Sequence, residues 1–199
     1  MSVKLIIEGG GDRKSKYLNQ AFRREFAKFL GKAGLAGKLP SIEAAGGRQQ
    51  AYDAFKSAHE RGDQVAVLLV DAEAPVTARD PWTHLNTRDG WTCPSGATND
   101  QCHLMVQIME SWFLADRPAL QEFYGQHFRS QALPGNPNIE QIPKQDVLNR
   151  LRQASRPTPK GAYDKGAHSF EILASLDPAK VIAASPHARR FVQALRDLS

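Results

Sequence analysis

The feature that most constrains this chain is a pair of short apolar runs that each end in carboxylates. Residues 3–7 lead into Glu8 and three glycines, and residues 64–70 lead into Asp71-Ala72-Glu73. Short, nearly unbroken runs rich in β-branched residues are typical of strands buried on both faces of a parallel sheet. Because open α/β sheets place their ligand sites at the carboxyl ends of strands, both runs predict acidic groups at one shared edge.

Helical patterns separate these strands. Apolar side chains recur at helical spacing over residues 13–32, with Asp12 as the expected N-cap, and again over residues 49–60. A weak strand at residues 41–45 lies between the two helices. The order strand, helix, strand, helix, strand over the first 73 residues predicts right-handed crossovers, a parallel central sheet and the α/β class.

The second half is expected to be mostly helical. Residues 100–115 are strongly apolar and predict a buried helix that carries Glu110. The other expected elements are helices at about 116–124 and 144–154, a short strand at 128–133, and a helical tail from 169 in which Pro178 and Pro186 mark helix starts.

Residues 74–99 show no periodic pattern and predict a long loop that begins at the acidic edge. Such a loop is expected to form a wall or lid over that edge. Its tryptophans, Trp82 and Trp91, have two open interpretations, since they can stack on nucleic-acid bases or anchor the loop to the core.

Composition limits the class of protein. The 199 residues predict one domain, and the net charge of +5 permits a polyanionic partner without requiring one. No apolar run approaches the roughly 20 residues needed to span a bilayer, and the chain starts directly in a strand pattern, so no signal peptide is expected. Cys93 and Cys102 are too few for a disulfide framework, which favours reduced thiols in the cytoplasm.

Three common kinds of functional site are not supported by the sequence. The glycines after Glu8 suggest a phosphate-binding P-loop, but the position before Lys14 needs glycine and holds Arg13. A zinc site built from Cys93, Cys102 and nearby histidines lacks the usual close cysteine pair. A serine or cysteine nucleophile has no supporting signature.

The remaining pattern is a divalent-metal site made of Glu8, Asp71 and Glu73, with Glu110 as a further member. Mg²⁺ is held by one or two carboxylates together with water and substrate phosphate. Asp71 and Glu73 would share one face if the strand continued through them. For Glu110, a carboxylate on a mostly buried element, the alternative is a structural salt bridge to an arginine.

These residues resemble the Toprim domain of topoisomerases, bacterial primases and overcoming-lysogenization-defect nucleases. Its signature is a glutamate after the first strand and an Asp-x-Asp after a later one. Glu8 and Asp71 match, whereas Glu73 is a departure. The closest resemblance is to a bacterial Toprim-like family catalogued as domain of unknown function 4276, carried by residues 7–12, 69–73 and 109–116. It implies a Rossmann-like three-layer sandwich forming one Toprim-like domain, with a core at about 1–125 and a helical extension at about 140–199.

The resemblance also implies a function, namely a Mg²⁺- or Mn²⁺-dependent nuclease acting on DNA or RNA, with an ATPase partner and a role in phage defence. Glu110 would join Glu8, Asp71 and Glu73 as metal ligands and catalytic groups. The expected phosphate-steering residues, chosen by charge and position, are Arg13, Lys14, Arg48 and Lys165, with His103 and His168 as further candidates. The rival hypothesis is a non-catalytic subunit that keeps the Toprim shape to bind nucleic acid or an ATPase.

Overall fold

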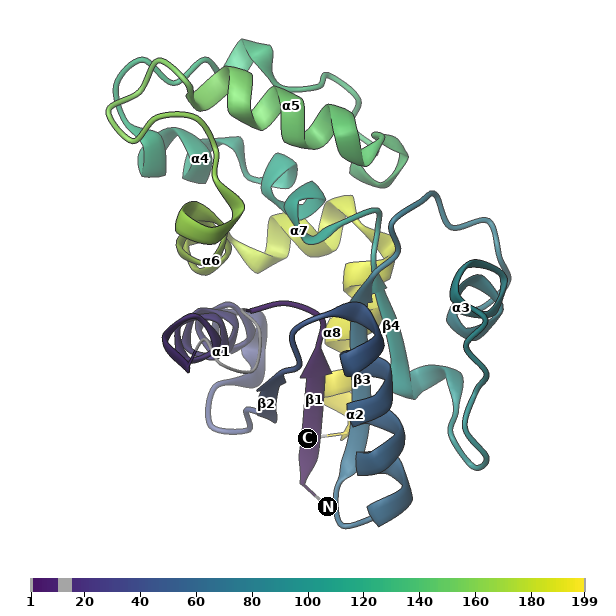
Figure 1. Ribbon diagram of the computed structural model, residues 1–199. Helices are drawn as coiled ribbons and strands as arrows, with labels where there is room; N and C mark the ends of the chain where they lie inside the picture. The colour runs from purple at the N-terminus through teal and green to yellow at the C-terminus, as the bar shows by residue number, and fades with distance from the viewer. Residues whose placement is uncertain (1, 11–15, 199) are drawn as a thin grey trace.

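The computed structural model describes residues 2–10 and 16–198, and its centre is a four-stranded parallel sheet (Figure 1). The strands lie in the order β2-β1-β3-β4. Their bounds are Val3–Ile7 for β1, Ser41–Ala44 for β2, Val65–Asp71 for β3 and Cys102–Met105 for β4. Residues in β1 and β3 are almost entirely buried, as unbroken apolar runs require when helices cover both faces of a sheet.

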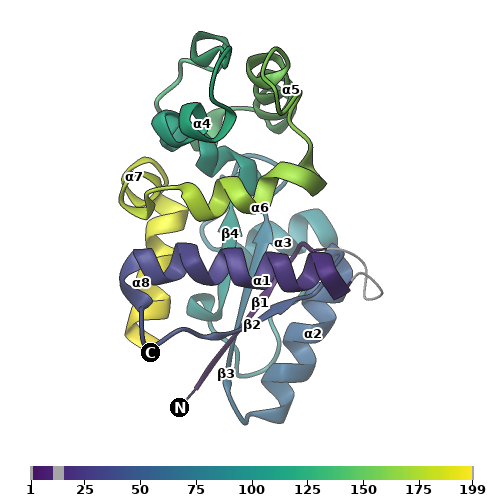
Figure 2. The same ribbon diagram turned by 90° about the vertical axis from the view of Figure 1, so that its left-hand side faces the viewer.

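Helices cover both faces of this sheet. The helices α1 (Lys16–Leu30) and α8 (Pro186–Leu198) share one apolar cluster, and α2 (Arg48–Arg61) belongs to the other; Figure 2 shows α8 and α2 on opposite sides of the sheet. The short helix α3 (Pro81–Asp89) packs with α2 in the same apolar cluster. The result is the predicted three-layer α/β fold with a parallel sheet.

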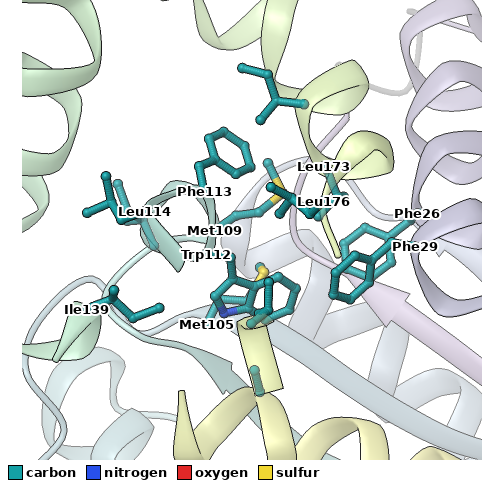
Figure 3. Close-up of a cluster of buried hydrophobic side chains, with 14 of the residues drawn as sticks. Phe26, Phe29, Met105, Met109, Trp112, Phe113, Leu114, Ile139, Leu173 and Leu176 are labelled. Carbon is teal, nitrogen blue, oxygen red and sulfur yellow. The ribbon is translucent and has the colours of Figure 1, made fainter. Parts of the chain in front are cut away.

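The larger apolar cluster joins residues from both ends of the chain, because it contains Leu5 of β1 and Leu195 of α8. Trp112 lies at its centre, stacked on Phe29 with ring centroids 5.5 Å apart (Figure 3). Trp112 and Phe29 are both fully buried. Aromatic contacts of this kind add to the free energy gained from burial alone, so this cluster holds the α1 face of the sheet to the C-terminal helices.

The other helices lie mostly beyond the carboxyl ends of the strands (Figure 1). The α-helices of this region are α4 (Arg117–Tyr124), α5 (Lys144–Ser155), α6 (Lys165–Ser175) and α7 (Pro178–Ala184). Short turns of other helix types are η1 (Gly31–Leu35), η2 (Asn99–Gln101), η3 (Met109–Ala115), η4 (Ser130–Ala132) and η5 (Ile139–Gln141). The predicted helical C-terminal part, including helix starts at Pro178 and Pro186, is confirmed.

The predicted helix over residues 100–115 is wrong. Its first part is β4, which pairs with β3, and its second part is the 3₁₀ helix η3. Every residue from 102 to 114 is buried, so no polar side appears in the pattern to separate a helix from a strand. The strand predicted at 128–133 is also wrong, because Ala132 and Leu133 donate to carbonyls only three residues back, as in a turn.

The aperiodic segment 74–99 is not wholly a loop, since it contains α3. Asp80 caps this helix by accepting from the Thr83 amide, Pro81 is its first residue, and Gly90 ends it in the left-handed conformation. Trp82 and Trp91 are both buried, and Trp91 stacks on Tyr52 at 4.5 Å. Of the two interpretations offered for the tryptophans, anchoring to the core is therefore the correct one.

No helix in residues 2–10 or 16–198 is long and apolar enough to cross a membrane. Cys93 is exposed, Cys102 is buried, and both are free thiols.

Candidate functional site

The acidic edge forms as expected where β1 and β3 end. Ile7 pairs with Leu69 in the parallel register, which brings Glu8 beside Asp71. Oε2 of Glu8 accepts from the Asp71 amide at 3.2 Å and from Nη1 of Arg48 at 3.0 Å. Burial raises the pKa of Glu8, and the charge of Arg48 opposes that rise.

Arg48, the first residue of α2, fixes this side of the site. Its guanidinium donates to both carboxylate oxygens of Asp89, at 2.8 and 2.6 Å, and to the Asp71 carbonyl at 2.5 Å. With Glu8 it therefore binds two carboxylates and one carbonyl. The guanidinium holds the strand ends, and the phosphate-steering role expected for Arg48 stays a prediction.

Asp71 lies at the end of β3 with only 5% of its surface exposed. Its Oδ1 accepts from the Met109 amide at 2.8 Å, and its Oδ2 is 3.8 Å from Nζ of Lys165. Burial raises the pKa of Asp71 well above its usual range, and the Lys165 charge works against that rise. The carboxyl is thus held in place by η3 and paired with a cation from α6.

Glu110 is fully buried in the first turn of η3. Its Oε1 accepts from the Tyr163 hydroxyl at 2.8 Å and is 3.5 Å from Nζ of Lys165. Its Oε2 is buried with no hydrogen-bond partner among residues 2–10 and 16–198. The salt bridge expected as the alternative for Glu110 exists, but its partner is a lysine. Lys165 thus lies between the carboxylates of Asp71 and Glu110.

Glu73 does not share a strand face with Asp71. The strand stops at Asp71, and Glu73 has φ 66°, the left-handed region in which non-glycine residues are uncommon. Its carboxylate forms an ion pair with Lys144 and lies 3.9 Å from Arg88. The sequence pattern could not predict this turn, because nothing in Asp-Ala-Glu marks a left-handed residue.

A cavity of about 270 Å³ opens between the strand ends, α1 and α6. Its polar side is formed by Glu8, Asp71, Glu73 and Lys165. Its apolar side includes Phe22 and Phe170, whose rings meet edge to face at 5.0 Å; the remaining apolar lining residues are Leu18, Met105 and Met109. Three of the four predicted carboxylates therefore line one cavity, and the fourth lies behind Lys165.

The chemistry of these donors suits a hard divalent cation, since all are carboxylate oxygens and one of them, Oε2 of Glu110, lacks a partner. In the arrangement seen, basic side chains pair with these carboxylates instead. Within the described ranges, no group of three or more His, Cys, Asp or Glu side chains is placed to hold a metal ion. Asp71 and Glu110, which share Lys165 in this arrangement, are the residues that would hold a metal.

The histidine candidates lie elsewhere. His103 is buried on β4 beside Arg190 and Phe191, and burial lowers its pKa to about 3. His168 bonds to the Tyr124 hydroxyl. Neither side chain lines the cavity as far as the described residues define it. Arg13 and Lys14 lie outside the described residues.

Three residues of the site were missed from the sequence: Lys144, Tyr163 and Asp89. Each contacts a predicted acid or its arginine from a distant part of the chain. A lysine at a helix start, a tyrosine in a Pro/Gly-interrupted segment and an aspartate at a helix end carry no motif. Only the tertiary fold brings them to the site.

The chain was also compared with known proteins. It matches the family described as Domain of unknown function (DUF4276) over residues 7–196. The chain belongs to this family. No curated protein and no solved structure matches it. The DUF4276 match begins at the last residue of β1 and ends within α8, and so includes every acidic residue of the site and the basic residues Arg48, Lys144 and Lys165 that pair with them.

Proposed function

We propose that this DUF4276 protein is a Toprim-like, Mg²⁺- or Mn²⁺-dependent phosphodiester hydrolase acting on nucleic acid. The observation that carries the proposal is the convergence of Asp71 and Glu110 on one cationic position, beside Glu8 and at the wall of a cavity. Clustered carboxylates repel each other unless a cation lies between them. Here Lys165 supplies that cation.

Asp71 and Glu110 are the residues that would hold the metal, with Glu8 as a further ligand and Glu73 at the cavity rim. A bound Mg²⁺ or Mn²⁺ supplies an activated water and stabilises negative charge on the phosphate. The chain's own residues orient these groups. The Met109 amide holds Asp71, Tyr163 holds Glu110, and Arg48 holds Glu8.

Glu8 is suited to exchange a proton. Its Oε2 accepts both of the hydrogen bonds described above, and the residue lines the cavity. Because burial raises its pKa, protonated and ionised forms of Glu8 lie closer in free energy than for an exposed carboxyl. We therefore assign Glu8 the role of general acid/base if it does not bind metal.

The Toprim relationship, the ATPase partner and the role in phage defence remain predictions of the resemblance. The ATPase partner and phage defence would be the cellular context of the proposed hydrolysis. We assign Lys165 a contact to a substrate phosphate, because it lines the cavity and most of its side chain, 61%, is exposed.

The rival proposal is a non-catalytic subunit that binds nucleic acid or an ATPase. One observation favours it: each acid of the site already has a basic partner, Arg48 for Glu8, Lys144 for Glu73 and Lys165 for Asp71 and Glu110. Such pairing holds the acidic side chains in place without a metal.

A plasmid-nicking assay with Mg²⁺ or Mn²⁺ tests the proposal. We expect wild-type protein to nick DNA, and both Asp71→Asn and Glu110→Gln to lose that activity. The control variant is Glu60→Gln, which removes an exposed carboxylate of α2 and should leave nicking unchanged. Nicking that persists in Asp71→Asn would sink the proposal.

Calorimetric titration separates the two functions. A hydrolase of this kind should bind Mn²⁺ with an affinity that Asp71→Asn abolishes and Glu60→Gln preserves. If the wild-type protein binds neither Mg²⁺ nor Mn²⁺ at millimolar concentration, the non-catalytic proposal takes its place.

A further inference from the structure

A basic surface lies on α5, outside the acidic cavity. A groove of about 740 Å³ runs along the C-terminal half of this helix. Its charged lining residues are Arg129, Arg152 and Arg156, all exposed, and its polar ones are Asn149 and Gln153. Among the described residues that line it, none is acidic.

The three arginines come from two segments brought together by the fold. Arg152 and Arg156 are four residues apart, at the end of α5 where basic side chains stabilise the helix dipole. Arg129 precedes α5 by more than a dozen residues, and its amide donates to the Ala154 carbonyl at 3.0 Å. Stabilisation of one helix end explains Arg152 and Arg156 and leaves Arg129 unexplained.

Their side chains are also unengaged. In the part of the chain that the structure describes, the guanidinium groups of Arg129, Arg152 and Arg156 have no hydrogen bond or ion pair. By contrast, Arg48 and Arg190 are each tied to a carboxylate. Arginine presents a planar fork of donors that fits phosphate oxygens. Three unengaged guanidiniums around one groove therefore suit the oxygens of a phosphate-bearing ligand.

The groove lies close to the acidic site. Ala162 lines the groove and Lys165 lines the cavity, and Tyr163 between them donates to Glu110. Three residues of chain span at most about 11 Å. Figure 1 shows this segment descending from α5 to α6 above the carboxyl ends of the strands.

We propose that this groove, defined by Arg129, Arg152 and Arg156, binds the sugar–phosphate backbone of a nucleic acid strand and directs it to the acidic cavity. Only the second part of this proposal, delivery of the strand to the acidic cavity, rests on the proposed function. A lipid surface is disfavoured, because the large apolar side chains exposed in the described ranges, Tyr17 and Leu39, do not line the groove.

The test compares a triple variant, R129Q/R152Q/R156Q, with Arg79→Gln. Arg79 is an exposed arginine just before α3, which packs in the apolar cluster on the other face of the sheet. Binding of short fluorescent single strands and duplexes of DNA and RNA is followed by anisotropy in EDTA, at several salt concentrations. Each phosphate contact contributes about 0.7 to the slope of log K against log salt for a single strand, and about 0.9 for a duplex.

We expect the triple variant to reduce that slope by about 2 or more. The variant R129K/R152K/R156K should keep most of the slope, because the charges remain. Since all three side chains are exposed, the triple variant should melt within a few degrees of wild type; if it does not, each single substitution should reduce the slope by about 0.7 to 0.9.

Four outcomes would overturn the proposal. They are no binding of any nucleic acid by the wild type, an unchanged slope in the groove variant, an equal loss in Arg79→Gln, and a preference of wild type for anionic vesicles or an acidic peptide over nucleic acid. Because EDTA prevents metal-dependent cleavage, these readings are independent of nicking. The groove proposal can therefore be tested even if the hydrolase proposal fails.

Discussion

The Tyr163 hydroxyl donates a hydrogen bond to Oε1 of Glu110 at 2.8 Å, and both residues are buried. Burial and the neighbouring Glu110 charge raise the pKa of Tyr163, so the phenol keeps its proton and remains a donor. This bond connects η3, which follows the last strand of the sheet, to the segment between α5 and α6. It is the contact that fixes the buried end of the acidic site.

Tyr163→Phe is predicted to destabilise the protein by about 1–3 kcal/mol, because Glu110 then loses its buried donor and keeps only Lys165. Urea unfolding followed by circular dichroism measures the change. The matched control is Tyr17→Phe, which removes an exposed hydroxyl and should cost nothing measurable. Equal stability of wild type and Tyr163→Phe would mean that the bond does not support Glu110.

The raised pKa of Asp71 predicts a specific pH dependence. Between its ordinary value of 3.8 and its raised value, native Asp71 still holds a proton that the unfolded chain has released. The native state therefore binds more protons in that window, and its stability falls as pH rises through it. In EDTA, the stability of wild type relative to Asp71→Asn should decrease from about pH 4 upward.

The control is Asp53→Asn, for which the dependence of stability on pH should have the opposite sign. The exposed Asp53 has a pKa lowered by its hydrogen bond to Lys56. Its small contribution should be present above its ordinary pKa and lost as pH falls. A relative stability for Asp71 that rises with pH would show that Lys165 outweighs burial at this site.

The sequence predicted the sheet well because its signals were local and unambiguous. The apolar runs before Glu8 and Asp71 contained enough β-branched residues to identify buried parallel strands. The helices between these strands had clear polar faces. β4 failed for the opposite reason. Cys102–Met105 and the following turn are buried all round, so periodicity could not distinguish a strand and a 3₁₀ turn from one helix.

The sequence predicted the acidic residues of the site but not the basic residues that form ion pairs with them. Glu8 and Asp71 meet because β1 and β3 end at one edge, which follows from their positions in the sequence, whereas Glu110 reaches the site from η3, after the strand β4 that was predicted as a helix. Their basic partners come from α2, α5 and α6, and no sequence rule assigns Lys144 to Glu73 or Lys165 to Glu110. Pairings of this kind depend on how the C-terminal helices pack.

Lys165→Met is predicted to make the protein more dependent on metal. Without the ammonium group, Asp71 and Glu110 face each other with no cation, and stability in EDTA should fall by on the order of 1 kcal/mol, a modest loss because Lys165 is largely exposed. Mn²⁺ should then raise the melting temperature more than in wild type, since no lysine competes. Lys38→Met, an exposed lysine before β2, is the control. A smaller Mn²⁺ effect in Lys165→Met would instead make the lysine part of the metal-binding arrangement.

Arg48→Lys is predicted to destabilise the protein despite keeping the charge. Arg48 holds Asp89 with two hydrogen bonds and reaches Glu8 from the same guanidinium, a geometry that one ammonium group cannot reproduce. We expect a loss of about 2 kcal/mol, because at least one largely buried carboxylate loses its donors.

Arg61→Lys is the control for this substitution, because Arg61 is exposed and lies 4.0 Å from Asp63. Its unfolding midpoint in urea should match that of wild type. Since Arg48 also holds Glu8 at the cavity, the same variant should shift the pH profile of any nicking activity, whereas Arg61→Lys should not. A variant Arg48→Lys with wild-type stability and an unchanged pH profile would show that charge alone, and not the paired geometry, holds the strand ends together.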